Sequence, residues 1–516
     1  MTSISRRHVI VLGAVGLLAA GCAPVQSPIP TPTRPPRQTQ SGFADWDALA
    51  SALTGTLTMP GDESYDTVRL VENPRYDDAR PIAVLTAASA ADVAAGVTYA
   101  VQHSVPLALR SGGHSYTGWS SGGATGTDMS PSLVIDTRGM SEVTLNDDNS
   151  VHIQAGASLA TVYTVLGNAS RAIAAGSCAT VGATGLVLGG GVGVLVRAFG
   201  LTCDSLTEVE IVTADGKLRT VSKTREPKLF WACQGGGGGH LGVVTALSLS
   251  THPAPEVTSF SLNWPFSEAA TVVKAWQTWA PEADPKLWST LKLLAGTRHP
   301  DGPGLYLSGT WIGAKSQLGA QLAPFLATVG VEPSHNGSST SSYLDAMMGY
   351  AGCADIPLPQ CQTGADGKLT RESSAATSHV PRIPLNSAGI ATLIAQVAAA
   401  STVPDLKEGG VSMDALGGAV RTLAPSATAF PHRTSIMTVQ YTATFPNGAD
   451  PAPFDDYVRG FRAALVPEWG DSAYVNYADA SLADPATSYF GSNVARLSMV
   501  RGEYDPNGLF SQPQGY

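Results

Sequence analysis

Two short glycine-rich segments carry side chains that could bind or react with a ligand. The first reads R-S-G-G-H-S-Y at residues 110–116, so that His114 directly follows two paired glycines. Glycines let backbone N–H groups approach an anion closely, as binding of a diphosphate requires. Taken alone, the segment is equally compatible with a surface turn that contains an incidental histidine.

The second segment contains a cysteine and is followed by further glycines. It reads G-S-C-A-T-V-G at 176–182 and continues with Gly185 and the run 189–193, and a third glycine run occupies 235–239. This density in an apolar stretch indicates backbone packed against another backbone or against a large flat ligand. A Rossmann site would instead need one G-x-G-x-x-G followed by an acidic residue.

The elements around the first segment are α/β in character. We expect strands at 82–85 and 105–109 and a helix at 90–103 between them, where Ser89 and Asp92 form an S-x-x-D capping pattern. One apolar stripe of this helix should contain Val93, Val97 and Val101. Further strands are expected at 134–136 and 151–154.

The chain changes character between residues 253 and 445, where the glycine loops stop. Helices are expected at 264–279 and 392–400, and strands at 307–311 and 436–444. Near the C-terminus we expect a helix at 489–504, ended by Pro506. One face of it should contain Phe490, Val494, Leu497 and Val500.

In order and spacing, these segments resemble the berberine-bridge-enzyme-like FAD-linked oxidases of the vanillyl-alcohol-oxidase superfamily. The resemblance rests on R-S-G-G-H-S-Y, G-S-C-A-T-V-G, G-G-G-V-G, L-F-W-A-C-Q-G-G-G-G-G and G-V-V-T, and on Y-V-N-Y at 474–477 with the closing block to 510. It implies an α+β fold in which a two-part PCMH-type FAD-binding domain receives an inserted substrate domain on an antiparallel sheet backed by helices. The corresponding boundaries are 43–253, 254–455 and 456–516.

The resemblance also implies a bicovalent FAD, joined to His114 through the flavin 8α-methyl and to Cys178 through flavin C6. Tyr477 is implied as the catalytic base, with either Tyr474 or the polar edge of the flavin lowering its pKa. The remaining cofactor-binding positions implied are Arg110, Ser111, Gly112, Gly113, Ser115, Tyr116, Val181, Gly182, Gly185, Gly190, Gly191, Gly193, Val244 and Asn476.

The implied reaction is hydride transfer from an alcohol, sugar or secondary metabolite to FAD. In the family the position of Val181 gates oxygen, and its small side chain favours an oxidase that yields hydrogen peroxide. Two alternatives stay open, a flavin dehydrogenase that uses another electron acceptor and a non-catalytic ligand-binding lipoprotein. The net charge of −10 argues against a nucleic-acid partner.

The N-terminal residues have the features of an export signal. Arg6 and Arg7 precede an apolar run at 9–20, and L-A-A-G-C at 18–22 resembles a lipobox that would place a lipid anchor on Cys22. We therefore expect a signal peptide at 1–22, a Pro-rich linker at 23–42, and an extracellular or membrane-anchored protein.

The remaining cysteines do not suggest a metal site, because the sequence has no C-x-x-C or histidine cluster. In an exported protein a local disulfide between Cys353 and Cys361 is plausible. Cys203 and Cys233 are either buried thiols or a second bridge. His432 either faces the pocket or is a structural histidine.

Overall fold

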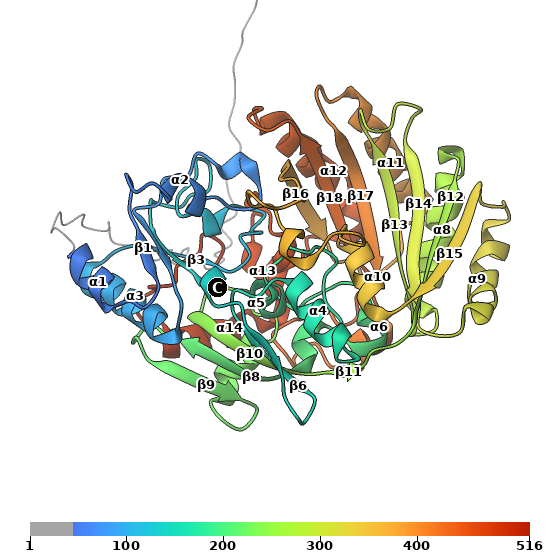
Figure 1. Ribbon diagram of the computed structural model, residues 1–516. Coiled ribbons are helices and arrows are strands. Elements are labelled where there is room, and N and C mark those ends of the chain that lie inside the picture. The colour runs from blue at the N-terminus through green and yellow to red at the C-terminus, as the bar shows by residue number, and fades with distance from the viewer. Residues whose placement is uncertain (1–44) are drawn as a thin grey trace, which may run out of the picture. The chain divides into compact units, whose positions relative to one another are not determined.

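The computed structural model describes residues 45–516 (Figure 1). The expected signal peptide, the linker and Cys22 therefore lie outside the described residues. Ala44–Tyr516 forms one compact unit. Within the described residues, no helix combines the length and the apolar character needed to cross a membrane.

A four-stranded sheet near the N-terminal side of this unit positions the histidine segment. Its order is β1-β2-β4-β3, with β2 and β3 both parallel to β4. The strands are β1 (Thr56–Thr58), β2 (Ala83–Thr86), β3 (Leu107–Arg110) and β4 (Leu133–Asp136). Helix α3 (Ala90–His103) connects β2 to β3, and Ser89 and Asp92 form the predicted capping box.

The predicted apolar stripe of α3 is correct in part. Val93 and Val97 are fully buried, but Val101 is 50% exposed. With 3.6 residues per turn, each four-residue step rotates the side chain by roughly 40°, so the third valine turns away from the sheet. The other N-terminal helices are α1 (Trp46–Ala52) and α2 (Tyr65–Val68).

An antiparallel five-stranded sheet supports the cysteine segment. Its order is β5 (Val143–Leu145), β6 (Ser150–Gln154), β10 (Val243–Ser250), β8 (Leu206–Val212) and β9 (Leu218–Ser222). A small pair joins β7 (Arg171–Ala172) to β11 (His252–Pro253). The same core cluster includes residues of α4 (Leu159–Asn168), α5 (Ala183–Leu188), α6 (Val196–Phe199) and α7 (Pro227–Cys233).

A seven-stranded antiparallel sheet forms the middle of the chain (Figure 1). Its order is β15 (His335–Ser341), β12 (Val257–Trp264), β14 (Gly304–Trp311), β13 (Leu287–Ala295), β17 (Glu408–Ala415), β18 (Met437–Phe445) and β16 (Ser373–His379). One face packs in a core with α8 (Ala269–Trp279), α9 (Lys315–Val329), α11 (Ser387–Ala399) and α12 (Ala452–Trp469). The expected helix from 264 instead begins at Ala269, because Trp264 precedes Pro265 and a residue before proline is biased towards extended backbone.

The C-terminal helices pack back on the core of the five-stranded sheet. The predicted helix at 489–504 is interrupted, since α13 (Pro485–Phe490) ends at Gly491 with φ +50° and α14 (Val494–Tyr504) follows. Glycine adopts this left-handed conformation easily and so ends the first helix. Phe490, Leu497 and Val500 are buried as predicted, and Val494 packs against the same cluster at partial exposure.

Arg197 of α6 joins the two cores. Its buried guanidinium donates to the carbonyl oxygens of Leu287 and Pro281 at 2.7 and 2.9 Å, and also to those of Leu416 and Ala283. Leu287 begins β13, and Leu416 follows β17 directly. One side chain therefore links the glycine-rich part of the chain to the ends of two central strands of the seven-stranded sheet.

Candidate functional site

The histidine segment leaves β3 as a short loop. Gly113 has φ +75°, a backbone conformation that favours glycine, and its carbonyl accepts a hydrogen bond from the Glu72 N–H at 3.2 Å. The Ser111 hydroxyl donates to the Ala155 carbonyl at 2.6 Å, and the Ser115 hydroxyl accepts from the Trp119 N–H at 3.2 Å. These bonds fix both ends of the loop and present His114 between them.

The cysteine segment is held by the N-terminal end of α4. The N–H groups of Leu159 and Ala160 donate to the carbonyls of Val181 and Ala179 at 2.9 and 3.0 Å. A β-bridge between Ser158 and Gly182 continues this contact. Cys178 is the first residue before the bonded stretch, and its side chain is exposed.

The two loops lie against each other. A Cβ placed on Gly112 would come within 2.2 Å of the Gly182 nitrogen, and one on Gly182 within 2.1 Å of the Ser111 hydroxyl. Across the same contact, His114 Nε2 lies 2.8 Å from the Thr180 hydroxyl oxygen. Both glycines are thus needed for backbone-to-backbone contact, which brings the predicted attachment residues into one neighbourhood.

The donor set of the histidine loop fits the phosphate part of FAD. Among the described residues, the backbone N–H groups of residues 112–115 donate no hydrogen bond to another part of the chain. Successive free N–H groups in a glycine-containing loop form an anion-binding concavity, which suits a diphosphate. When FAD is bound, this loop would hold it beside His114 and Cys178.

The charge states of His114 and Cys178 follow from their surroundings. Burial lowers the pKa of His114 to about 4, with a hydrogen bond to the Thr180 backbone opposing the change, so the imidazole is neutral at pH 7. Although Cys178 is exposed as a residue, the surrounding protein limits the hydration of its sulfur and so raises the pKa of the thiol, and the Glu72 carboxylate adds to this increase. Burial also raises the pKa of Glu72, whose Oε2 lies 3.9 Å from His114 Nε2.

Tyr474 and Asn476 are bound to the cysteine-side glycines. The Tyr474 hydroxyl accepts hydrogen bonds from the N–H groups of Gly191 and Val192 at 2.9 and 3.2 Å. The Asn476 amide donates to this hydroxyl and to the Leu186 carbonyl, both at 2.9 Å. Through these hydrogen bonds, the Y-V-N-Y motif joins the C-terminal region to α5 and to the loop that follows it.

Tyr477 lies in an aromatic group with Tyr116 and Tyr474. Its ring is stacked on that of Tyr116 at 5.6 Å between centroids and 8° between planes, and it lies edge-on to Tyr474 at 5.0 Å. The pKa of Tyr477 is raised well above its usual value by burial, followed by the charges of Asp414, Tyr116, Tyr474 and Cys178. The expectation that Tyr474 lowers this pKa is therefore wrong for the protein chain, because Tyr474 adds to the increase.

The second face of the seven-stranded sheet is polar and meets this aromatic group. Strand register aligns Thr290 of β13, Asp414 of β17 and Thr438 of β18 in one row across the sheet. A second row on the same face, two residues further along β13, consists of Lys292, Ser412 and Gln440. The Gln440 amide donates to the Tyr116 hydroxyl at 2.5 Å, so this face looks towards the histidine loop. Intervening residues such as Leu291, Met413 and Val439 belong to the helix-covered core.

Asp414 and Lys292 were not identified from the sequence. Burial raises the pKa of Asp414, while Thr290 and Lys292 oppose the increase. Lys292 lies close enough to Cys178 to affect the pKa of that thiol. Alternation of polar and apolar residues along β13 and β17 was the available signal, since every second residue of a strand shares a face.

Several other predicted cofactor-binding positions lie in or contact the protein framework. The Arg110 guanidinium is buried, pairs with Asp136 at 2.9 Å and donates to the carbonyls of Val68 and Arg69. A Cβ on Gly193 would come within 2.1 Å of the Ala175 carbonyl oxygen, so this glycine meets backbone. Gly185 lies in α5, Gly190 follows α5 with φ +123°, and Val244 is buried in β10.

The structure shows the bonding state of the remaining cysteines and of His432. Cys353 and Cys361 form the predicted disulfide, while Cys203 and Cys233 are free and buried. His432 is buried, and its Nε2 bonds the Tyr489 carbonyl at 2.9 Å, as expected of a structural histidine.

Comparison with known proteins assigns the family. A family described as FAD binding domain matches residues 81–222, and one described as berberine and berberine like matches 473–515. An uncharacterized FAD-linked oxidoreductase of Bacillus subtilis is 32% identical over 89% of this chain and 96% of its own. A chitooligosaccharide oxidase of Gibberella zeae is 31% identical over 84% of this chain and 87% of its own.

The chain belongs to the berberine-bridge-enzyme-like family of FAD-linked oxidases. A solved chitooligosaccharide oxidase superposes on this FAD-linked oxidase with a TM-score of 0.80 at 28% identity, covering 91% of this chain and 99% of the other. A xylooligosaccharide oxidase of Myceliophthora thermophila, solved with xylobiose, gives 0.81 at 25% identity, covering 92% and 98%. These matches confirm the α+β PCMH-type fold, an oxidoreductase activity and FAD as the cofactor.

Within the oxidase, the two matched regions meet at the site. Residues 81–222 contain both His114 and Cys178, and residues 473–515 contain Tyr474, Asn476 and Tyr477. The hydrogen bonds from Gly191 and Val192 to the Tyr474 hydroxyl join the two regions directly.

Proposed function

We propose that this oxidase carries FAD attached to both His114 and Cys178 and oxidises a hydroxyl group of a carbohydrate-like substrate, with dioxygen as the electron acceptor. The observation that carries the proposal is the meeting of the two attachment loops, on one side, with Tyr477 and the polar sheet face on the other. His114 and Thr180 join the loops, and the stacked rings of Tyr116 and Tyr477 join them to the base.

The substrate class follows from the chemistry of the sheet face. Thr290, Lys292, Ser412, Asp414 and Gln440 offer hydroxyl, amine, carboxyl and amide groups on one surface. A polyhydroxylated substrate can exchange its hydration for hydrogen bonds with such groups. Two relatives are named for chitooligosaccharides and xylooligosaccharides, which agrees with this choice.

Proton removal falls to Tyr477 in this proposal. Bound FAD would accept the hydride from the substrate carbon and pass the two electrons to dioxygen. The hydroxyl proton of the substrate must leave at the same time, and the phenol oxygen of Tyr477 can receive it only after releasing its own proton. Asp414, whose charge affects the pKa of Tyr477, is the nearby carboxylate that can take that proton.

FAD binding and substrate binding fall to different parts of the chain in this proposal. Residues 43–253 and the C-terminal region bind FAD, and the inserted sheet binds substrate. Helix α12 (Ala452–Trp469) contacts β16 and β18, so we place the return to the FAD-binding part after Trp469 rather than at 456. The segment 1–22, with Cys22, belongs to the same proposal as an export signal with a lipid anchor.

Measurements of flavin attachment and of substrate oxidation test the proposal. Flavin fluorescence that survives a denaturing gel, and peptide masses with flavin on both His114 and Cys178, are expected of the wild type, with one site lost in each of the His114→Ala and Cys178→Ala variants. A peroxide-coupled screen of neutral oligosaccharides should then identify a substrate. Absence of covalent flavin contradicts the attachment, and slow reoxidation of the reduced protein in air contradicts the oxidase in favour of a dehydrogenase.

A further inference from the structure

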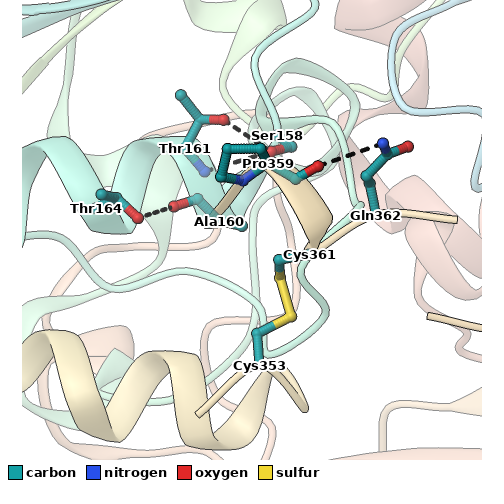
Figure 2. The surroundings of a disulfide bond; sticks show 8 residues. All are labelled: Ser158, Ala160, Thr161, Thr164, Cys353, Pro359, Cys361 and Gln362. Atoms are coloured by element: carbon teal, nitrogen blue, oxygen red, sulfur yellow. Dashed lines mark hydrogen bonds between the residues drawn. A yellow bond between two sulfur atoms is a disulfide. The ribbon is translucent and has the colours of Figure 1, made fainter. Parts of the chain in front are cut away.

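A loop closed by a disulfide lies against the cysteine attachment loop. Cys353 and Cys361 are both buried and form one apolar cluster with Ala160 and Ala179, the residue directly after Cys178. Figure 2 shows the bridge beside the N-terminal end of α4, where Ser158, Ala160 and Thr161 lie. The bridge is therefore in the immediate surroundings of the cysteine loop, although it belongs to the inserted part of the chain.

The path from the disulfide to Cys178 runs through the start of α4. The short turn Leu358–Gln360, which precedes Cys361, contacts α4, and so does helix α10 (Tyr343–Tyr350), which precedes Cys353. The first two N–H groups of α4 in turn donate to carbonyls of the cysteine loop on both sides of Thr180. Fixing the disulfide loop thus fixes the surface on which the cysteine loop rests.

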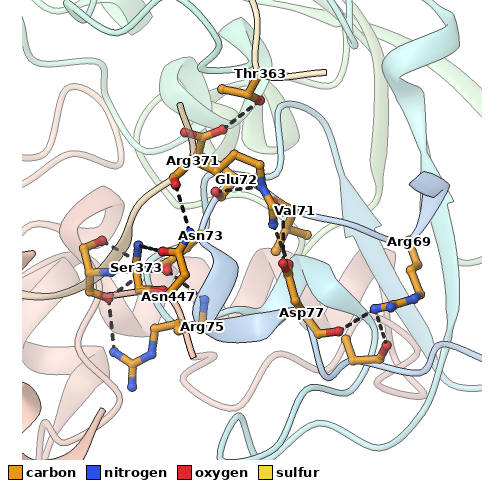
Figure 3. Close-up of polar contacts among 12 residues, drawn as sticks. Arg69, Val71, Glu72, Asn73, Arg75, Asp77, Thr363, Arg371, Ser373 and Asn447 are labelled. Atoms are coloured by element: carbon orange, nitrogen blue, oxygen red, sulfur yellow. Dashed lines mark hydrogen bonds and ion pairs between the residues drawn. The ribbon is translucent and has the colours of Figure 1, made fainter. Parts of the chain in front are cut away.

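The same segment also reaches the histidine loop. The Thr363 hydroxyl donates to Glu72 Oε2 at 3.3 Å, and the Arg371 side chain donates to the Val71 carbonyl at 2.9 Å and pairs with Asp77 (Figure 3). The Glu72 N–H is bonded to the Gly113 carbonyl. Residues 353–371 therefore contact the supports of both attachment loops.

We propose that segment 353–371, whose first part is closed by the Cys353–Cys361 disulfide, is a brace that positions the Cys178 loop for attachment to flavin C6. The inference rests on the proposed bicovalent flavin. Cys353 and Cys361 are positioning residues in this role, since neither contacts the reacting atoms. Loops that carry reactive groups need a rigid support, and a covalent cross-link within a short loop limits local opening.

The attachment reaction defines what the brace must promote. A C–S bond forms between Cys178 and flavin C6, while the thiol S–H and the flavin C6–H are lost. Two electrons and two protons are released onto the ring and then reduce dioxygen to hydrogen peroxide. Since the thiol must approach C6 within a narrow range of positions, a displacement of the loop by about 1 Å is enough to slow the step.

The test compares Cys353→Ser/Cys361→Ser with Val397→Ala, both in the full-length chain. Val397 is fully buried in α11, in the core on the helix-covered side of the sheet, so its truncation destabilises the same part of the chain without contacting the brace. Peptide masses give the flavin-bearing fraction of Cys178 and of His114 separately. We expect the double variant to lose attachment at Cys178 by at least about tenfold, with His114 attachment largely kept and both kept in Val397→Ala.

Each result decides between the hypotheses. Equal attachment at Cys178 in the wild type and the double variant, or an equal loss in Val397→Ala, overturns the brace and leaves the proposed function intact. A wild type without flavin on Cys178 overturns both. If the double variant does not fold, wild-type protein made in a reducing and in an oxidising host replaces it, because unchanged Cys178 attachment with reduced Cys353 and Cys361 also overturns the brace.

Discussion

His114 Nε2 and the Thr180 hydroxyl oxygen lie 2.8 Å apart, and this hydrogen bond joins the loop that contains His114 to the loop that contains Cys178. Thr180 comes two residues after Cys178. The imidazole is neutral at pH 7, so its unprotonated nitrogen can accept a hydrogen bond and its other nitrogen can donate one. The position of each loop therefore depends on the other.

Thr180→Val removes this hydrogen bond and keeps the shape of the side chain. One hydrogen bond contributes about 1 kcal/mol, which corresponds to about a fivefold change in rate. We expect flavin attachment at His114 to slow by about that factor, measured by peptide mass during reconstitution. Thr180→Ser keeps the hydroxyl and serves as the control, and equal rates in both variants contradict the role of the bond.

Tyr477→Phe tests the proposed role of Tyr477 as the base directly. Removing a positioned proton acceptor costs about 10²–10⁴-fold in turnover. We expect kcat to fall by at least about 10²-fold while covalent flavin content and KM stay close to wild type. A variant that keeps full turnover removes Tyr477 from the catalytic residues.

Asp414→Asn should lower the pKa of Tyr477. The carboxylate raises that pKa because a nearby negative charge disfavours the phenolate, so its loss acts in the opposite direction. The ionisation of Tyr477 in a pH profile of substrate oxidation should move to lower pH, whatever the change in maximal rate. The isosteric amide keeps the packing, and an unchanged or higher apparent pKa argues against an electrostatic effect of Asp414 on Tyr477.

Acid should destabilise the protein through His432. Burial lowers the pKa of His432 to about 4, against about 6.5 in an unfolded chain, so the unfolded state binds more protons between these values. The stabilisation is complete above about pH 6.5 and is lost as the pH falls towards 4, by about 2 kcal/mol at pH 5. Urea unfolding of His432→Gln at pH 7 and 5 should show a smaller pH dependence than the wild type.

Arg197→Met should weaken the link between the two cores. The substitution leaves carbonyl oxygens of Leu287, Pro281, Leu416 and Ala283 without their donor. Each buried acceptor left unsatisfied costs about 1–3 kcal/mol, so we expect a loss of at least about 3 kcal/mol in the free energy of unfolding. A urea midpoint within error of the wild type contradicts this role.

Capping residues and apolar spacing within a single segment were enough to predict elements such as α3. The capping box of α3 and the burial of Val93 and Val97 follow from spacing alone. The break at Gly491 was missed because apolar periodicity continues across it, and only a short 3-10 turn, Gly491–Asn493, separates the two helices.

The sequence identifies candidate site residues where they stand in contiguous motifs and misses those whose placement depends on strand register. His114, Cys178 and Tyr477 stand in recognisable segments, but Asp414 and Lys292 come from separate strands of the inserted sheet. Their shared face depends on how β13, β17 and β18 pair, which sequence patterns on single strands do not specify. The environment of Tyr477 had the same limitation, since the groups that raise its pKa come from four different segments.

The bond from the Gly191 N–H to the Tyr474 hydroxyl spans 283 positions of the chain. During synthesis, the early loops leave the ribosome long before their tyrosine partner has been translated. The Gly191 N–H group therefore lacks this hydrogen-bond partner until the last tenth of the polypeptide has been synthesised. A translation product that ends before residue 474 therefore leaves the Gly191 and Val192 N–H groups without their hydroxyl partner.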